Sequence, residues 1–427
     1  MNEAQIITIK NRIKTLTKTV IFKNFSALMI LQLGNNALAL LIMPYLINVL
    51  GISNYGSYSF AFAISMYLVI ITDYGFGFTG VRLISVHRDN INKISSIFHS
   101  IQIIKIIILV IVLIIYSLAI VFIDVLSVNK ELFFLSFGIL IGQTIIPIWF
   151  FHGMEKMKFI TIINLMIRLT ALILILIFVK QPEDINFAIA SQAFGFSFAG
   201  LLSIYFAYKN FNLKFRVPKI SVIYQMLISN RFMFFSSLSL SVYKNFNVVL
   251  LGFLSTNIEV GVYSAAEKII KAVQSLIAPL SQAIYPNMSL KFSKLKPNES
   301  VSKLFSLSKL YLLPLLCITL LLILFENFII GFLGITNHNF SKVLFVLLPL
   351  IVLGSLNYLF GIIGLANLNK EKLFNRVTIT GGVLNLILCW LLSENYGAIG
   401  SAIAILVAEL VVFLLVINYL LKIKKIK

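Results

Sequence analysis

The sequence predicts an all-α, polytopic membrane protein with about 12 transmembrane helices. Of its 427 residues, 59% are hydrophobic and only 12% are charged, a balance too apolar for a soluble domain of this length. The mean hydropathy of +0.99 agrees with that class. Many apolar stretches reach about twenty residues, which is enough to cross a hydrocarbon core of about 30 Å.

A window of about nineteen residues locates the individual spans. They are expected at residues 25–48, 55–77, 100–123, 132–151, 159–179, 187–208, 232–254, 262–286, 304–325, 341–364, 374–393 and 398–421. The chain then divides into a basic segment (1–24), an N-terminal six-helix bundle (25–208), a basic linker (209–231), a C-terminal six-helix bundle (232–421) and a basic tail (422–427). The first segment carries Ile and Leu at helical spacing among lysines, which is typical of an interfacial helix or of a basic tail.

The basic residues indicate the orientation of the chain in the membrane. The net charge is +20, and most Lys and Arg residues fall in alternate loops, with only Lys130 and Lys180 in the opposite set. The positive-inside rule therefore predicts that both termini are cytoplasmic, and it accounts for the charge without a nucleic-acid partner. The basic linker is expected to lie against anionic lipid headgroups.

A short internal repeat relates the two halves. Gly261-Val262-Tyr263-Ser264-Ala265-Ala266 echoes Gly56-Ser57-Tyr58-Ser59-Phe60-Ala61, and each copy follows a Leu-Gly pair. Within each half, one expected span precedes the copy (25–48 and 232–254), so the halves are expected to run in parallel. This arrangement predicts two bundles related by a pseudo-two-fold axis along the membrane normal, as in many transporters.

Four cations lie inside expected spans, where an ionisable group usually faces a cavity or a partner. They are Lys268, Lys271, Lys244 and Arg168. Ser264 and Ser275 share a helical face with the first two. The pattern predicts a cationic cavity for an anionic cargo, such as a diphosphate or an acidic sugar, because Lys and Arg are the residues that bind phosphate.

Further polar residues extend this hypothesis. Asn247, Gln32 and Asn35 are expected to line the cavity, although interhelical hydrogen bonding explains them equally well. Asp73 and Glu409 are candidates for ion coupling, because burial raises the pKa of a carboxyl group. The competing interpretation is that acids and cations pair to join helices, with Glu267 next to Lys271 and Asp73 next to Arg82.

The sequence contains no pattern typical of an enzyme. It lacks a nucleophile elbow, a phosphate-binding glycine loop and the spacing of a metal site. The loops expected on the external side are short, which disfavours a glycan polymerase or a membrane glycosyltransferase. We therefore expect no catalytic residues, no metal and no cofactor.

Three segments carry a resemblance to a known family. They are PYLINVLGISNYGSYSFA from Pro44, PIWFFHGMEKMKF from Pro147 and LLGFLSTNIEVGVYSAAEKI from Leu250. Together they resemble the bacterial polysaccharide flippases (Wzx type) of the multidrug/oligosaccharidyl-lipid/polysaccharide exporter superfamily. The resemblance extends over nearly the whole chain, with His152 where the family more usually has Gln.

The resemblance implies a cargo and a mechanism. Such proteins move a polyprenyl-diphosphate-linked oligosaccharide, for example an O-antigen unit of lipopolysaccharide, from the cytoplasmic to the outer leaflet of the bacterial plasma (inner) membrane. Their two bundles open alternately to either side, and we expect ion coupling. Lys268 and Lys271, beside the matching motif, are the cavity residues that the resemblance carries over. The expected partners are the lipid-linked substrate, membrane lipids, a glycan polymerase and a chain-length protein.

Two alternatives share the architecture. A multidrug or organic-cation antiporter of the same superfamily is expected to have an acidic cavity, in contrast to the lysines and arginine here. A flippase for the peptidoglycan precursor is the other.

Overall fold

The computed structural model describes residues 20–276, 288, 292, 295–368 and 370–425, with the backbone alone at 20–39, 240, 244, 245, 310 and 366. All of the main elements in this part are helices. They are α2 (Val20–Asp73), α3 (Phe76–Val86), α4 (Ile91–Phe122), α5 (Asp124–Ser127), α6 (Lys130–Leu135), α7 (Phe137–Ile145), α8 (Ile148–Gly153), α9 (Met157–Phe178), α10 (Ile185–Phe211), α11 (Ile220–Asn245), α12 (Asn247–Leu254), α13 (Asn257–Ser275), α15 (Pro297–Leu324), α16 (Glu326–Leu333), α17 (Asn339–Leu347), α18 (Pro349–Tyr358) and α19 (Glu371–Lys425), with the short helices η1 (Pro182–Asp184) and η2 (Leu359–Ala366).

Eight helical segments of the described residues are long and apolar enough to cross a membrane, or nine if the bent pair α11 and α12 forms one span. Two of them, α2 and α19, have 54 and 55 residues and bend at Gly51 and Gly397, whose backbones are not helical. Each is long enough for two of the expected spans. The end of the expected span 262–286 lies outside the described residues. The chain is thus an all-helical, multi-pass membrane protein.

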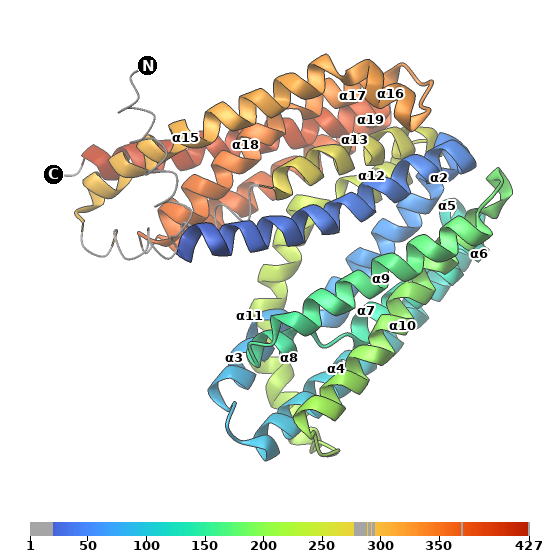
Figure 1. The fold of residues 1–427 in the computed structure, drawn as a ribbon, viewed down its shortest axis with the longest axis vertical. Coiled ribbons are helices and arrows are strands. Elements are labelled where there is room, and N and C mark those ends of the chain that lie inside the picture. The colour runs from blue at the N-terminus through green and yellow to red at the C-terminus, as the bar shows by residue number, and fades with distance from the viewer. Residues whose placement is uncertain (1–19, 277–287, 289–291, 293–294, 369, 426–427) are drawn as a thin grey trace, which may run out of the picture.

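The helices form two groups. In Figure 1 the N-terminal group contains α4 to α10, and the C-terminal group contains α12 to α19. The groups meet near the bend of α2 and diverge toward the opposite end of the molecule. We call that opposite end the basic end; it carries the loops 87–90, 154–156 and 212–219.

Where the groups meet, α2 and α13 cross at two glycines, which are the first residues of the two repeat copies. A Cβ on Gly56 would lie 1.8 Å from the Asn257 carbonyl oxygen, and a Cβ on Gly261 would lie 2.2 Å from the Ile52 carbonyl oxygen. Gly56 thus contacts the residue four positions before Gly261, and Gly261 contacts the residue four positions before Gly56. The contact is therefore reciprocal. Any larger side chain at either position would force the two helices apart.

Helix α11 connects the groups. The linker expected at 209–231 is non-helical only over 212–219, since α11 already begins at Ile220. Its first turns dock on the N-terminal group: the Asn230 side chain donates a hydrogen bond to the Tyr74 carbonyl, and the Tyr74 ring stacks on Phe234 at 4.7 Å. These contacts explain why the basic segment folds as a helix instead of remaining a loop. The rest of α11 continues into the C-terminal group (Figure 1).

Candidate functional site

A cavity with a volume of about 550 Å³ lies between the two groups. Helix α2 contributes to it from one side and α13 from the other, while α7, α9 and α10 complete the wall of the N-terminal group. Its polar and charged lining consists of Tyr58, Gln143, Asn164, Arg168, Gln192, Lys268, Lys271 and Ser275. The remaining lining is apolar.

A second compartment of about 360 Å³ adjoins the first one. It lies between the second part of α2, α12 and α13, and it adds Ser59, Ser264 and Glu267 to the polar lining. Lys268 and Lys271 line both compartments. The two lysines therefore stand at the junction between the compartments.

Lys268 links the two groups directly. Its Nζ donates a hydrogen bond of 2.8 Å to the hydroxyl of Tyr55 on α2. The same ammonium lies 5.0 Å from the centre of the Tyr55 ring and 5.9 Å from that of Tyr58. Aromatic faces and a hydroxyl stabilise a cation without adding a negative charge beside it.

Lys271 forms an ion pair with Glu267, one helical turn away, at 3.1 Å. The pairing that the competing interpretation predicted is therefore present at this position. The Lys271 side chain nevertheless remains 42% exposed and lines the cavity. Across both compartments the charged lining comprises Lys268, Lys271, Arg168 and Glu267, so the described lining is net positive.

Arg168 lies opposite these lysines on α9, in the wall of the N-terminal group. Its Nη1 is buried and has no hydrogen-bond partner among the described residues. A guanidinium nitrogen without a partner at this depth is costly unless water or a ligand accepts its hydrogen. Arg168 is thus placed to donate to an anion in the cavity.

Three amide side chains on this wall were not singled out as site residues from the sequence. Gln143 lies on α7, Asn164 on α9 and Gln192 on α10, and all three line the larger cavity. The available signal was an amide within an otherwise apolar span. That signal is weak, because an isolated Gln or Asn often bonds to a neighbouring helix.

The remaining predicted residues have different locations. Ser264 and Ser275 line the cavity, whereas Asn247 is buried within the C-terminal group, where it donates to the Ser401 carbonyl at 3.1 Å and bonds to Asn385. The side chains of Gln32, Asn35 and Lys244 lie outside the described residues.

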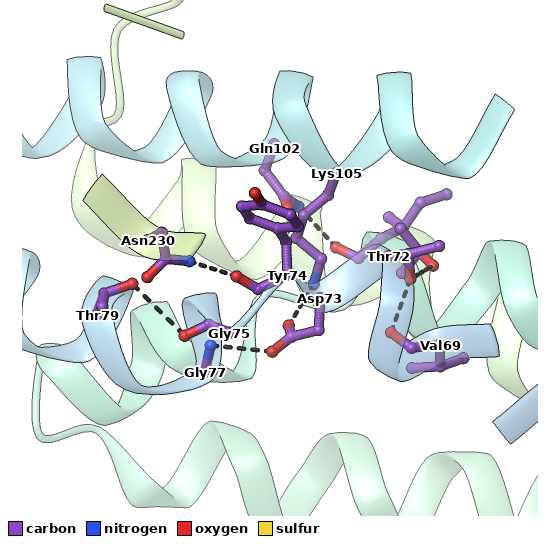
Figure 2. A network of polar contacts seen from close by, with 12 residues as sticks. Val69, Thr72, Asp73, Tyr74, Gly75, Gly77, Thr79, Gln102, Lys105 and Asn230 are labelled. Atoms are coloured by element: carbon purple, nitrogen blue, oxygen red, sulfur yellow. Dashed lines mark hydrogen bonds and ion pairs between the residues drawn. The ribbon is translucent and has the colours of Figure 1, made fainter. Parts of the chain in front are cut away.

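Asp73 lies at the break between α2 and α3, away from the cavity lining. Figure 2 shows its carboxylate between the Lys105 ammonium at 3.1 Å and the backbone N–H of Gly77 at 3.0 Å. The sequence suggested Arg82 as its partner. This expectation was wrong, because Lys105 is buried on α4, faces the break and pairs with Asp73 instead.

Glu409 lies on α19, within the C-terminal group. The Asn357 side chain donates hydrogen bonds to its carboxylate at 2.5 Å and to its backbone carbonyl at 3.0 Å. No cation pairs with this carboxylate among the described residues, and it does not line either compartment of the cavity. Its hydrogen-bond partner is therefore a neutral amide.

Comparison with known proteins fixes the family. A family model described as "Polysaccharide biosynthesis protein" matches residues 21–292. The chain belongs to this family. It is 30% identical over 400 residues to an Escherichia coli (strain K12) protein named "Putative O-antigen transporter", covering 93% of this chain and 96% of that protein. A Shigella dysenteriae protein of the same name is 30% identical over 406 residues, with 93% and 99% covered.

Solved structures share the fold at low sequence identity. An inward-facing multidrug resistance MATE family transporter of the MOP superfamily has a TM-score of 0.68 and 15% identity, with 93% of this chain and 99% of that chain covered. The lipid II flippase MurJ, in an inward closed conformation, has a TM-score of 0.64 and 13% identity, with 95% and 90% covered. The resemblance inferred from the sequence segments is confirmed at the level of the family, which is one of transporters and not of enzymes.

Proposed function

We propose that this polysaccharide biosynthesis protein is a flippase that carries a polyprenyl-diphosphate-linked oligosaccharide, such as an O-antigen unit. The transport runs from the cytoplasmic to the outer leaflet of the bacterial inner membrane, by alternating access. The observation that carries the proposal is the net positive cavity between the two helix groups. The names of the 30% identical relatives support the same class of cargo.

The charge of the cavity suits a diphosphate. At physiological pH a diphosphate diester is anionic and accepts hydrogen bonds without donating any, so it needs donors. Lys268, Lys271 and Arg168 carry only donors. Because these cations sit in a membrane-embedded protein with low surrounding dielectric, their attraction for an anion is less screened than at a surface.

The distribution of basic loops supports a cavity that opens toward the cytoplasm, where the cargo would enter. With the basic end on the cytoplasmic side, as the positive-inside rule predicts, the helix groups diverge toward the cytoplasm and the Gly56–Gly261 crossing closes the outer side. The reciprocal geometry of this crossing supports a pseudo-two-fold relation between the halves. Opening to the outside would require α2 and α13 to separate there.

For ion coupling, we retain Glu409 and set Asp73 aside. Asp73 is already paired with Lys105 and bonded to Gly77, and protonating it would leave Lys105 buried without a counter-charge. Glu409 is bonded to a neutral amide, so it can gain a proton without leaving a cation behind.

A multidrug antiporter is the second candidate because a multidrug transporter shares the fold. Its cationic cargo would meet Lys268, Lys271 and Arg168 with Glu267 as the single acid of the described cavity lining. The repulsion makes this cargo the poorer match.

The proposal is tested by measuring surface glycan in a strain in which variants replace the native gene. The Lys268→Gln/Lys271→Gln double variant should lower surface glycan about tenfold or more, which corresponds to about 1.4 kcal/mol of lost interaction, and lipid-linked intermediates should accumulate. Lys342→Gln is the matched control, because Lys342 is exposed and outside the cavity.

The charge at residue 271 alone should also affect export. Lys271→Arg should retain more export than Lys271→Glu. If the double variant reaches the membrane at normal levels and sustains full export, or if the Arg and Glu variants are equally active, the cavity does not bind the anion. Unchanged sensitivity to cationic drugs in the gene deletion would further separate the flippase from a multidrug antiporter.

A further inference from the structure

We propose that Gln143, Asn164 and Gln192 form a sugar-recognition subsite that binds hydroxyl and acetamido groups of the cargo. This inference rests on the proposed function and adds a division of labour within the cavity. One wall, on α13, carries Lys268 and Lys271 for the diphosphate. The facing wall, on α7, α9 and α10, carries the three amides.

The amides are brought together only by folding. Gln143, Asn164 and Gln192 come from three different helices of the N-terminal group, and α10 packs along both α7 and α9. The packing is close, since a Cβ on Gly142 would lie 2.3 Å from the Phe196 carbonyl carbon. That contact fixes α7 against α10 directly beside Gln143, so the wall is preorganised.

Two of the amides have no partner of their own. Gln143 and Asn164 make no hydrogen bond to any other residue in the described part of the chain. Both side chains are partly exposed in the cavity, whereas amides within membrane helices ordinarily bond to a neighbouring helix. Here they face the cavity instead, so water or cargo must satisfy them. This is the arrangement expected of a binding wall.

The chemistry of the amide group separates sugars from phosphates. A side-chain amide both donates and accepts, whereas Lys and Arg can only donate. A sugar hydroxyl also donates and accepts, and its hydrogen can be bonded by the Gln or Asn carbonyl but not by a cation. An ionised diphosphate has no hydrogen to donate. The amides therefore match sugars, whereas the two lysines, together with Arg168 beside Asn164 on α9, match the diphosphate.

Tyr58 on α2 connects the walls. Its hydroxyl forms a side-chain hydrogen bond with Gln192, and its ring lies 5.9 Å from the Lys268 ammonium. A cargo with its diphosphate at Lys268 would thus have its sugars directed toward the amides. Phe62 and Phe196 line the same region and offer apolar surface to the C–H faces of a sugar ring.

The test compares a ligand with and without the sugar. Purified protein in nanodiscs is titrated with undecaprenyl diphosphate and with undecaprenyl-diphosphate-linked N-acetylglucosamine. The free diphosphate has one more ionisable oxygen than the sugar-bearing ligand, so each variant is compared with the wild type on the same ligand. Gln143→Met and Asn164→Leu preserve the approximate size of each side chain, and each should weaken the sugar-bearing ligand about tenfold while leaving undecaprenyl diphosphate unchanged. Gln225→Met, at an exposed amide outside the cavity, should change neither affinity.

The outcomes separate this inference from the proposed function. Lys268→Gln should weaken both ligands, and if it weakens neither, the proposed function fails. If the lysine variant weakens both ligands but the amide variants change neither, or change both equally, the lysine site stands and the sugar subsite is wrong. Normal thermal unfolding of each variant in the same nanodiscs establishes that it is folded.

Discussion

Two lysine–carboxylate pairs lie at membrane-embedded positions of this protein, and their surroundings differ. Lys105 pairs with Asp73 at 3.1 Å, and Lys271 pairs with Glu267 at the same distance. The Lys105 side chain is 4% exposed, however, while that of Lys271 is 42% exposed. The distance between the charges therefore does not distinguish them. Their access to the cavity does.

The connectivity of the pairs explains the difference. Asp73 and Lys105 lie on two helices, α2 and α4, so their pair holds the α2–α3 break against a neighbour (Figure 2). Glu267 and Lys271 lie one turn apart on α13, so their pair joins no helices. The first pair joins two helices, and the second lines the cavity. The sequence hypothesis that such pairs only join helices therefore applies to one pair and not to the other.

The largest effect on stability is expected at the Lys105–Asp73 pair. Lys105→Met should lower the free energy of unfolding by about 2–3 kcal/mol, toward the low end of the range for breaking a buried ion pair, because Asp73 is 34% exposed and partly hydrated. Unfolding by SDS titration in mixed micelles measures the change. Met keeps most of the volume of the Lys side chain, so loss of packing does not account for the lost stability.

The double variant Lys105→Met/Asp73→Asn sharpens this result. Asn retains an acceptor for the Gly77 N–H and removes the unpaired charge, so at least half of the lost stability should return. A loss below about 0.5 kcal/mol in Lys105→Met, within the range of ordinary surface substitutions, would show that the pair does not hold the break.

The same substitution at the cavity should have a smaller effect on stability. Lys271→Met should cost less than about 1 kcal/mol, as for solvent-accessible ion pairs, because the Lys271 side chain is 42% exposed and Glu267 still accepts a hydrogen bond from Tyr263 at 3.4 Å. The identical SDS titration measures it. If Lys271→Met destabilised the protein as much as Lys105→Met does, the two pairs would have the same structural role.

The smallest effect is expected at a surface pair, Arg88–Glu155, with 2.8 Å between the charged atoms. The hydrogen bond and charge of Arg88 lower the pKa of Glu155 below its ordinary value of 4.5. A carboxylate with a lowered pKa stabilises the fold above its unfolded-state pKa, and this contribution is lost as the pH falls through the folded-state pKa. Glu155→Gln should thus lower the unfolding midpoint slightly at pH 7, and the difference from wild type should shrink as the pH falls below 4.5 and vanish below the lowered folded-state pKa.

Glu183→Gln is the control for this comparison, because Glu183 is exposed and forms no ion pair within the described chain. It should show no such pH-dependent difference. Screening provides a second criterion, since added salt weakens exposed pairs. A Glu155→Gln effect that persisted unchanged at pH 4 or at 1 M salt would rule out the ion pair as its source.

The sequence by itself determined the class of the protein and part of its site. Apolar runs of twenty residues have few alternatives to a membrane helix, because the backbone must satisfy its hydrogen bonds internally in lipid. Lys268 and Lys271 stood out because a cation in such a run is costly, and the Glu267–Lys271 pair followed from helical periodicity alone. Each of these inferences depends only on residues close together in the chain.

Only the tertiary structure decided which distant residues meet. The sequence showed the two repeat copies, but it did not show that they contact each other at Gly56 and Gly261. Lys105 reached Asp73, and three amides converged with Arg168, through the packing of helices far apart in the sequence. Periodicity specifies which residues share a face of one helix, but the partner of that face is set by how whole helices pack.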